Sequence, residues 1–470
     1  MNTKKLLIPV LCSLAFGLGA CGGDSATEAE PVVSPFGGVT PPMSESVLSS
    51  TILSSASVPP VINGQTAPLA SVASLTVPAN LYTDWKAFHY VTFEEEAAYY
   101  GSVASGFNYV FSAAYQPAAR VVWSTAQSTP YSAQCKVDDT SKPAMKFRGC
   151  TVSEGIGYGM LITAMQDDII AFNSLWNYSR AFRAYNNQAL TPWLTFSFHF
   201  NEIDLGSATD ADLDIATSLF LMYNKTNEAA YLNDALVIAG AIWDKEVKDN
   251  KLLSGDTPMW DGTKGPIVYN LSYFSPVALR LFAKYDTGHN WTAVLDAMYT
   301  YMASIQAKGT GVFPDWSTET TSVNPPNNAA GTEKSGYTYY TFNKESVRIP
   351  WRIAWDYYWF QDPRALAVLQ TLNQFIVGKS GGDPTSAALA VNYSWDLSIG
   401  PDNARNTAVP AQWLAAWCAT GIGTNPTWLE ACTTALNAKT VSNTASSYFP
   451  DILLMMYSQL LNGKYIRPAI

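Results

Sequence analysis

Apolar residues recur at helical spacing along most of the chain beyond residue 80. Between Tyr158 and Ala184, for instance, Met160, Leu161 and Ala164 fall on one face of a helix. Similar patterns return at intervals of about thirty to forty residues, as expected for helical hairpins packed side by side. The pattern predicts helices around Glu94–Tyr115 and over Tyr158–Ala184, Asp212–Tyr223, Glu228–Val247, Ser275–Tyr285, Trp291–Ala307, Ile349–Phe360, Pro363–Val377, Pro410–Ala419, Pro426–Leu436 and Tyr448–Leu461.

The segments between these helices include long loops rich in Trp, Tyr, Gly and Asn. Examples are Asn186–Asp210, Leu253–Tyr273 and Gly311–Arg348. Few stretches of the chain alternate between apolar and polar residues as strands would. We therefore expect one mainly α domain over residues 80–470, with functional loops gathered at the ends of its helices.

The composition points to an exported protein that handles uncharged polar ligands. Charged residues make up only 14% of the chain, which also contains 15 Trp and 26 Tyr. A net charge of −10 argues against nucleic acid or an anionic membrane surface as a partner. The histidines, His89, His199 and His289, are too far apart in sequence to suggest a metal pair, so we expect no metal and no other cofactor.

The first 79 residues have the pattern of an export signal followed by a tether. Lys4 and Lys5 precede an apolar run over residues 6–18, and the run ends in Leu18-Gly19-Ala20-Cys21. This ending is typical of a lipoprotein signal, cleaved before Cys21 and lipidated on its thiol; an ordinary signal peptide is the alternative. Residues 22–79 contain no Lys or Arg and are rich in Ser, Pro and Thr, which predicts a flexible tether. We expect a membrane-anchored lipoprotein at the bacterial cell surface or in the periplasm.

Four cysteines lie beyond the tether. An even number in an exported chain suggests disulfides. The simplest pairing joins Cys135 to Cys150 and Cys418 to Cys432, although other pairings remain open. The first of these bonds would hold the segment that leads into Glu154.

The stretch Thr151–Leu161 is the first candidate for chemistry. Glu154 has no cation within five residues and is followed by Gly155, Gly157 and Gly159. We expect an extended lead-in, a turn that carries Glu154, and then a buried helix. Because glycine is a poor helix former, we interpret the glycines as backbone that passes close to a ligand. A desolvated carboxyl there would act as a general acid; alternatively, Glu154 is a first-turn acid favoured by the helix dipole.

Two further stretches concentrate acidic residues at expected helix starts. In the first, Asp210 is a candidate for chemistry, whereas Asp212 and Asp214 are interpreted as helix-stabilising acids. Calcium is a minor alternative, because the Gly and the bidentate Glu of an EF-hand loop are missing. In the second, Glu345 precedes Arg348, which would orient a carboxylate with two hydrogen bonds. The alternative there is a structural ion-pair network of Arg348, Arg352 and Asp356.

Five motifs in order resemble glycoside hydrolase family 8, whose members are endo-acting enzymes on β-1,4-linked glucans, xylans and chitosan. The motifs are Ser153–Met160, Ala208–Ala216, Leu271–Phe274, Phe313–Trp316 and Arg348–Arg352. The resemblance covers about residues 80–465. It implies an (α/α)6 barrel with a substrate cleft across one end, and inversion of configuration at the anomeric carbon.

The resemblance also implies roles for individual residues. Glu154 would be the general acid, and Asp210 would lie at the sugar in the central subsite. Tyr273 would lie near the nucleophilic water, and Trp193 would stack on a sugar ring. Many members carry Asp three residues before the arginine of the last motif, where this chain has Glu345.

We predict that Glu345 is the general base, held ionised by Arg348 one helical turn further on. The competing candidates are Glu319 and Glu333 in the preceding loop and Asp356 in the following helix. Aromatic rings would supply flat faces for the sugar rings. The residues expected to bind substrate are Trp193, Trp260, Trp316 and Tyr158, and Trp351 is a further aromatic candidate.

The expected partner is a β-linked polysaccharide or oligosaccharide, bound by a monomer. Cellulose or mixed-linkage β-glucan is favoured by the aromatic residues, and chitosan and xylan are the alternatives within the family. Two rivals come from other classes. One is a surface glycan-binding lipoprotein without turnover, suggested by the departure at Glu345. The other is a polysaccharide lyase, which the acidic balance of the chain disfavours.

Overall fold

The computed structural model describes residues 80–101, 111–123, 149–195, 197–198, 202–319, 340–397, 411–442 and 447–468. The expected signal, the lipidation site Cys21 and the tether lie outside the described residues, as do Cys135 and Glu333. None of the described helices combines the length and the apolarity needed to span a bilayer.

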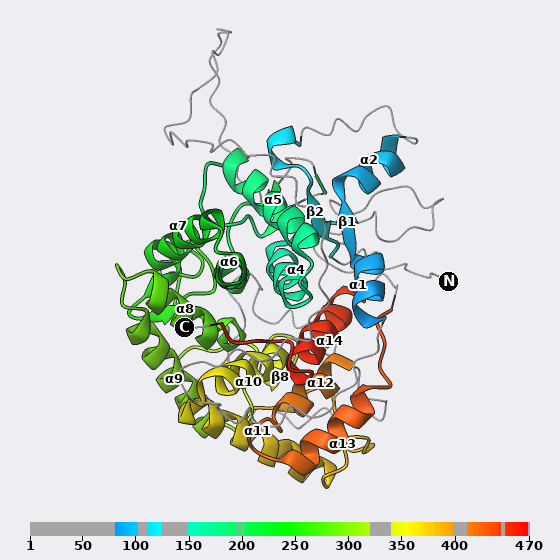
Figure 1. The fold of residues 1–470 in the computed structure, drawn as a ribbon. Coiled ribbons are helices and arrows are strands. Elements are labelled where there is room, and N and C mark those ends of the chain that lie inside the picture. The colour runs from blue at the N-terminus through cyan, green and yellow to red at the C-terminus, as the bar shows by residue number, and fades with distance from the viewer. Residues whose placement is uncertain are drawn as a thin grey trace, which may run out of the picture. The chain divides into compact units, whose positions relative to one another are not determined.

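An inner ring of six helices forms the centre of the described fold (Figure 1). Each inner helix packs against the next in chain order, and the last closes the ring by packing against the first. These helices are α4 (Ser153–Met165), α6 (Thr209–Thr226), α8 (Pro276–Tyr285), α10 (Ile349–Phe360), α12 (Ala411–Ala419) and α14 (Tyr448–Leu461).

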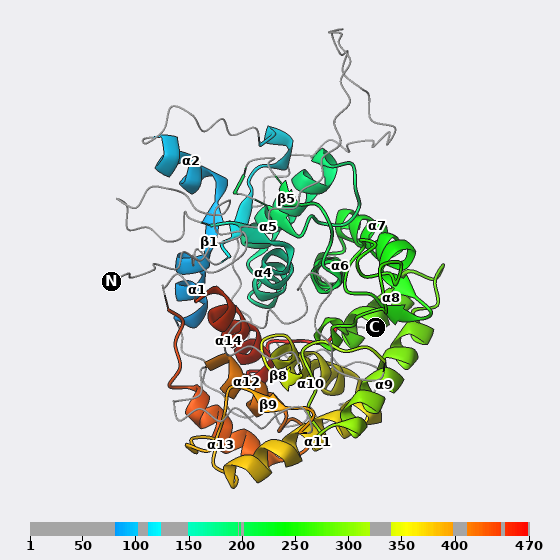
Figure 2. The same ribbon diagram turned by 180° about the vertical axis from the view of Figure 1, so that it is seen from behind.

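Six outer helices surround this ring, as the reverse view also shows (Figure 2). They are α1 (Leu81–His89), α5 (Ile169–Tyr185), α7 (Ala229–Glu246), α9 (Trp291–Lys308), α11 (Pro363–Ser380) and α13 (Pro426–Leu436). Five of them pack on the inner helix that precedes them in the chain, and α1 packs on α14. The double ring is the (α/α)6 barrel that the resemblance implied.

The strands are short and antiparallel. A three-stranded sheet of β3 (Thr151–Val152), β4 (Leu194–Thr195) and β5 (Glu202–Asp204) leads into α4 and α6. The other pairs are β1 (Tyr90–Thr92) with β2 (Ala119–Val121), β6 (Val247–Lys248) with β7 (Lys251–Leu252), and β8 (Thr341–Phe342) with β9 (Tyr393–Ser394). The remaining helices of the described residues are α2 (Phe93–Gly101) and the 3-10 turns η1 (Ala113–Tyr115), η3 (Leu271–Tyr273) and η4 (Ser346–Arg348).

The sequence pattern predicted most inner and outer helices but missed two features. Helix α1 was not expected, because its region is aromatic and mixed in period. The helix predicted over Tyr158–Ala184 is in fact two helices, α4 and α5. The break comes at Asp167, whose φ of 57° is left-handed, and at Asp168, which caps α5 by accepting a hydrogen bond from Ala171 N at 3.0 Å. The break turns an apparent long helix into an inner–outer hairpin.

The glycines after Glu154 allow close packing of α4 against protein neighbours, so the prediction that they border a ligand is wrong. All three lie inside α4, which begins at Ser153. A Cβ on Gly157 would lie 3.0 Å from the carbonyl of Ala211 in α6, and one on Gly159 would lie 2.8 Å from the side chain of Val121. The helix can approach its neighbours this closely only without side chains at these positions.

A disulfide joins Cys418 in α12 to Cys432 in α13, the expected pairing, and ties an inner helix to its outer partner. Cys150 also takes part in a disulfide, and its expected partner Cys135 lies outside the described residues. Trp351 is fully buried in the core, where its indole N–H donates to the Tyr465 hydroxyl at 3.0 Å, so it offers no face to a sugar.

Candidate active site

The candidate catalytic residues gather where the inner helices begin. Because each outer helix returns the chain, successive inner helices run in the same direction and start at the same end of the ring. Glu154 lies in the first turn of α4, and Asp210 lies in the first turn of α6. Tyr273 ends η3 just before α8, and Glu345 precedes η4, which leads into α10.

Arg348 connects two of these carboxylates. Its Nη1 donates to Asp210 Oδ2 at 2.8 Å, and its Nη2 donates to Glu345 Oε2. The guanidinium also lies over the ring of Tyr273, with its carbon 5.3 Å from the ring centroid. Arg348 and Asp210 are buried, whereas the side chain of Glu345 is 24% exposed. The arginine therefore fixes two acids from different helices around one charge.

Tyr158 belongs to this network and not to the substrate-binding surface, so its predicted role is wrong. Its side chain is only 1% exposed, and a buried ring cannot stack on a sugar. Its hydroxyl accepts from Arg348 Nη1 at 2.9 Å and donates to Asp210 Oδ2 at 3.2 Å. Tyr158 thus holds Arg348 and Asp210 together through its buried hydroxyl.

Glu154 differs from these acids in having no ion pair among the described residues. It is partly exposed, and its Oε1 accepts a long hydrogen bond of 3.4 Å from the indole Nε1 of Trp193. The pairing of β3 with β4 places Trp193 there, because Ser153 N donates to the Trp193 carbonyl at 2.9 Å. Burial, reinforced by the nearby charge of Asp210, raises the pKa of Glu154 to about 8. The carboxyl is therefore protonated at neutral pH and can act as an acid.

The other groups in the cluster have different charge states. Burial raises the pKa of Asp210 to about 6, against the opposing charges of Arg348 and Arg352, so Asp210 is mostly ionised at neutral pH. Burial and then the charges of Asp210, Glu345 and Glu154 raise the pKa of Tyr273, which remains a neutral phenol. No described residue forms a hydrogen bond with the Tyr273 hydroxyl.

A second arginine–carboxylate pair lies one helical turn further along α10. Arg352 binds Asp214 through two hydrogen bonds of 2.7 and 2.9 Å, and its Nε donates to the Ser272 carbonyl at 2.7 Å. The alternative that paired Arg352 with Asp356 is wrong. Asp356 instead accepts from Arg280 of the neighbouring inner helix α8 at 2.7 and 3.1 Å, which makes it a buried structural residue and not a base.

The three aspartates of α6 have separate partners, which contradicts the calcium alternative. Asp210 binds Arg348, Asp214 binds Arg352, and Asp212 Oδ1 accepts from Thr191 N at 2.9 Å. Their carboxylates are therefore not turned to one ion. Among the described residues, no group of three or more His, Cys, Asp or Glu is arranged to hold a metal.

The aromatic candidates lie in two places. Trp193 is half-buried beside Glu154 and packs edge-on against Trp123, with the centroids 6.4 Å apart. Trp260 and Trp316 stack on each other at 5.4 Å and 11°, and each is 8% exposed. Trp316 also packs against Tyr273 at 6.3 Å, which joins the stacked pair to the carboxylate cluster.

Sequence reasoning missed two residues that support Glu345. Asn270 Nδ2 donates to Glu345 Oε2 at 2.9 Å, and Asp315 Oδ1 accepts from Asn343 N, Ser346 N and Ser346 Oγ around the Glu345 turn. Asn270 adjoins the motif Leu271–Phe274, and Asp315 lies within the motif Phe313–Trp316. Their positions in the sequence could therefore have marked them as candidates. Of the competing bases, Glu319 is 56% exposed and pairs with Lys251 at 2.8 Å, and Glu333 lies outside the described residues.

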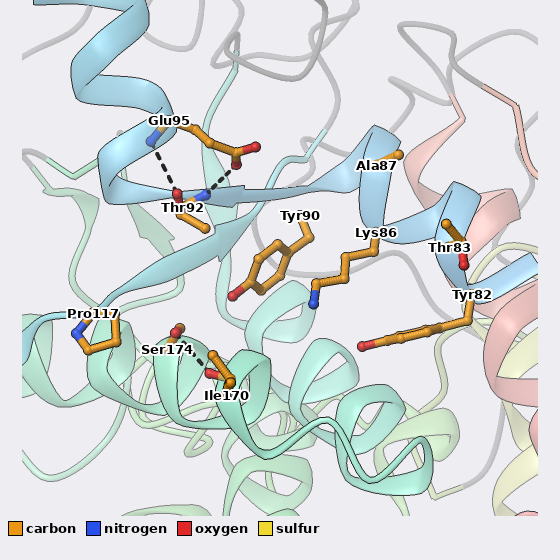
Figure 3. A pocket seen from close by; sticks show the side chains of 10 residues that line it. All are labelled: Tyr82, Thr83, Lys86, Ala87, Tyr90, Thr92, Glu95, Pro117, Ile170 and Ser174. Carbon is orange, nitrogen blue, oxygen red and sulfur yellow. Dashed lines mark hydrogen bonds between the residues drawn. The ribbon is translucent and has the colours of Figure 1, made fainter. Parts of the chain in front are cut away.

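A cavity of about 540 Å³ lies elsewhere, between α1, β1 and the start of α5 (Figure 3). Its lining includes Tyr82, Lys86, Tyr90 and the exposed Ile170. Since α5 starts where α4 ends, this cavity faces the end of the barrel opposite Glu154. It contains none of the residues of the carboxylate cluster.

Comparison with known proteins identifies the family. The sequence profile of "Glycosyl hydrolases family 8" matches residues 97–388. The chain belongs to this family. It is 29% identical over 321 residues to Endoglucanase 2 of Ruminiclostridium josui, a match that covers 67% of this chain and 64% of that protein. It is 30% identical over 233 residues to Endoglucanase A of Acetivibrio thermocellus, covering 48% of this chain and 46% of that protein.

Structural comparison agrees with the fold. The beta-1,3-1,4-glucanase of Paenibacillus sp. X4 superposes with a TM-score of 0.61 at 24% identity, over 82% of this chain and 90% of that one. The chain thus spans about half to two-thirds of the length of the two endoglucanases and most of the length of this structure. Membership of family 8 and the (α/α)6 barrel agree with the expectation drawn from the five motifs.

Proposed function

We propose that this family 8 chain is an endo-acting, inverting hydrolase of β-1,4-linked glucan, with cellulose or mixed-linkage β-glucan as its substrate. The observation that carries the proposal is the uneven pairing of three neighbouring carboxyl groups. Glu154 has no ion pair among the described residues and a raised pKa, whereas Asp210 and Glu345 share Arg348. Inverting hydrolysis requires one protonated and one ionised carboxyl, separated by roughly 6.5–9.5 Å with a water between the base and the sugar.

In the proposed reaction, Glu154 gives its proton to the glycosidic oxygen as the bond from that oxygen to the anomeric carbon breaks. A water attacks the opposite face of the same carbon and transfers a proton to Glu345. Asp210, with its negative charge, stabilises the positive charge that develops on the ring. Trp193, half-buried beside Glu154, offers an aromatic surface for a neighbouring sugar, whereas Trp260 and Trp316 are buried and stacked on each other.

The names of the relatives support a β-glucan substrate, since two are endoglucanases and the similar structure is a β-1,3-1,4-glucanase. The test is hydrolysis of a panel of cellulose, mixed-linkage glucan, chitosan and xylan, with NMR of the first products. We expect reducing ends of α configuration from β-glucan. Binding without release of reducing sugar would indicate a glycan-binding protein. Ultraviolet-absorbing products from a uronate polymer added to the panel would indicate a lyase. Faster cleavage of chitosan or xylan would change the substrate but not the reaction.

We also propose that the chain is an exported monomer anchored by lipid on Cys21. The apolar run followed by Leu18-Gly19-Ala20-Cys21 and the polar tether support this. In cells fed labelled palmitate, the wild-type chain should carry label and fractionate with membranes. Cys21→Ser should lose both properties. An unlabelled wild-type chain in the soluble exported fraction would favour the ordinary signal peptide.

A further inference from the structure

The two carboxylate oxygens of Glu345 have different surroundings. Oε2 accepts from both Asn270 Nδ2, at 2.9 Å, and Arg348 Nη2. No described residue donates a hydrogen bond to Oε1. One oxygen is therefore held by two donors from different segments, and the other is open on a side chain that is 24% exposed.

The orientation of the Asn270 amide is determined by its other contacts. Its Oδ1 accepts from Ser272 N at 3.0 Å and from Ser272 Oγ at 2.7 Å. Its own backbone N–H donates to Ser254 Oγ at 3.2 Å. Because two donors require an oxygen at Oδ1, the NH2 group must face Glu345. Asn270 is 3% exposed, so its side chain has little freedom to turn elsewhere.

The backbone around Glu345 is held separately from its carboxylate. Asp315 Oδ1 accepts from Asn343 N and Ser346 N, both at 3.0 Å, and from Ser346 Oγ at 2.7 Å. Glu has one more side-chain torsion than Asp, so a fixed backbone alone leaves its carboxylate free to move. Asn270 and Arg348 remove that freedom at the far end of the side chain.

We infer that Asn270 is a positioning residue that, with Arg348, locks Oε2 of Glu345 and so assigns Oε1 as the atom that takes the proton from water. The inference rests on the proposed inverting hydrolysis. In that step an O–H bond of the water breaks, its proton goes to Oε1, and its oxygen bonds to the anomeric carbon. Oε2 remains bound to its two donors throughout.

The test is Asn270→Asp in the full chain. This near-isosteric change keeps the oxygen that Ser272 needs but replaces the donor with a second negative charge beside Glu345. We expect kcat to fall about 100-fold with KM within about twofold, since the defect lies in activating water. Because a like charge disfavours ionisation, the acidic limb of kcat/KM should also move up by about one pH unit. A purely structural role would not move that limb.

Two comparisons make the test decisive. Asn290→Asp, at the exposed start of α9, makes the same chemical change far from the site and should retain wild-type kinetics. Asn270→Ala removes the donor without adding charge and should lower kcat about 10-fold, which keeps the inference testable should Asn270→Asp not fold.

The outcomes separate this inference from the proposed function. Wild-type kcat and pH profile in folded Asn270 variants, beside an inactive Glu345→Ala, would overturn the role of Asn270 alone. A rise in KM at unchanged kcat would assign Asn270 to substrate binding and would also overturn its role. Full activity in Glu345→Ala would remove the base, and this inference with it.

Discussion

Arg348 and Arg352 lie one turn apart at the start of α10, yet their surroundings differ in kind. Arg352 meets one carboxylate, Asp214, with two hydrogen bonds, and its Nε donates to the backbone carbonyl of Ser272; the whole group is buried. Arg348 is shared between Asp210 and Glu345, and Glu154 lies nearby with no ion pair among the residues that the structure describes. The Arg352–Asp214 pair has no net charge. Around Arg348, the described residues place one cation beside three carboxyl groups.

This difference explains why chemistry is expected at one pair and not at the other. In a buried pair of one arginine and one carboxylate, both carboxylate oxygens accept from the guanidinium, so the carboxylate is not available to exchange a proton with a ligand. In the cluster around Arg348, burial and the charge of Asp210 keep Glu154 protonated. With more carboxyl groups than arginines, the cluster can hold one protonated and one ionised carboxyl side by side, as the proposed reaction requires.

The largest effect should come from removing the acid. Glu154→Gln should keep the fold but lower turnover of polymer by about 10³-fold or more, because the leaving oxygen is no longer protonated. Kinetics on an aryl glycoside with a good leaving group provide the check, since such a substrate needs little protonation and should lose far less. Glu228→Gln, on the exposed surface before α7, is the matched control. Equal losses on both substrates would count against the general-acid role.

Substitution of Asp210 should reduce activity, whereas substitution of Asp214 should reduce stability. Asp210→Asn should lower kcat by about 10³-fold with little change in melting temperature. Asp214→Asn leaves Arg352 buried without a counter-charge and should lower the free energy of unfolding by about 3–5 kcal/mol. Urea denaturation and specific activity of the folded fraction measure the two effects. If Asp210→Asn were unstable but active, the roles would be reversed.

Removing the base should be recoverable with an external nucleophile. Glu345→Ala should lower hydrolysis about 10²-fold, and azide should restore turnover because it needs no deprotonation. The product to look for by NMR is a glycosyl azide of inverted configuration. Near-normal hydrolysis without azide would transfer the role to another carboxylate, with Glu333 the first to examine.

The sequence predicted the helices well where the apolar spacing is accompanied by residues that mark a helix start. Helices α10, α13 and α14 begin and end at the predicted residues, and each has Pro, Asn or Ser near its start. The hairpin between α4 and α5 was missed because Asp167 and Asp168 interrupt an otherwise continuous apolar pattern. The spacing of apolar residues does not reveal a turn that is formed by one residue in the left-handed conformation.

The site was predictable as a set of residues but not as a set of contacts. Glu154, Asp210, Glu345 and Arg348 stand out as acids and a cation at helix starts. The partner of each is set by distant segments: Arg348 lies 138 positions from Asp210, and Asn270 lies 75 positions from Glu345. Tyr158 was misassigned for the same reason, since one sequence does not show which aromatic rings the barrel buries.

Asp212 extends the comparison to a carboxylate with no cation. It is fully buried between Asp210 and Asp214 in sequence, and among the described residues it forms no ion pair. Arg183 influences it from a distance but is bound to Asp234 at 3.0 and 2.5 Å. Glu246 at the end of α7 is equally buried and accepts from Ser207 Oγ at 2.5 Å.

The last prediction is a pH dependence of stability that originates in Asp212. Burial, with the charges of Asp256 and Asp210, raises its pKa to about 8 in the folded chain, from a model-peptide value of 3.8. The folded state then holds a proton that the unfolded state has lost. Stability is therefore fully present below about pH 4 and falls as pH rises towards 8, by at most about 1.4 kcal/mol per pH unit.

Replacing Asp212 by Asn should remove this slope, since the amide has no proton to lose. Urea denaturation between about pH 5 and pH 8.5 should show a shallower fall for Asp212→Asn than for the wild type, so that the variant gains relative stability towards alkaline pH. Glu246→Gln should act in the same direction, because burial and then the charge of Asp212 raise the pKa of Glu246. Asp244→Asn, exposed two residues earlier in α7, should leave the slope unchanged. Parallel curves for Asp212→Asn and the wild type would mean that Asp212 is already ionised in the folded chain, and that a buried carboxylate here needs no arginine.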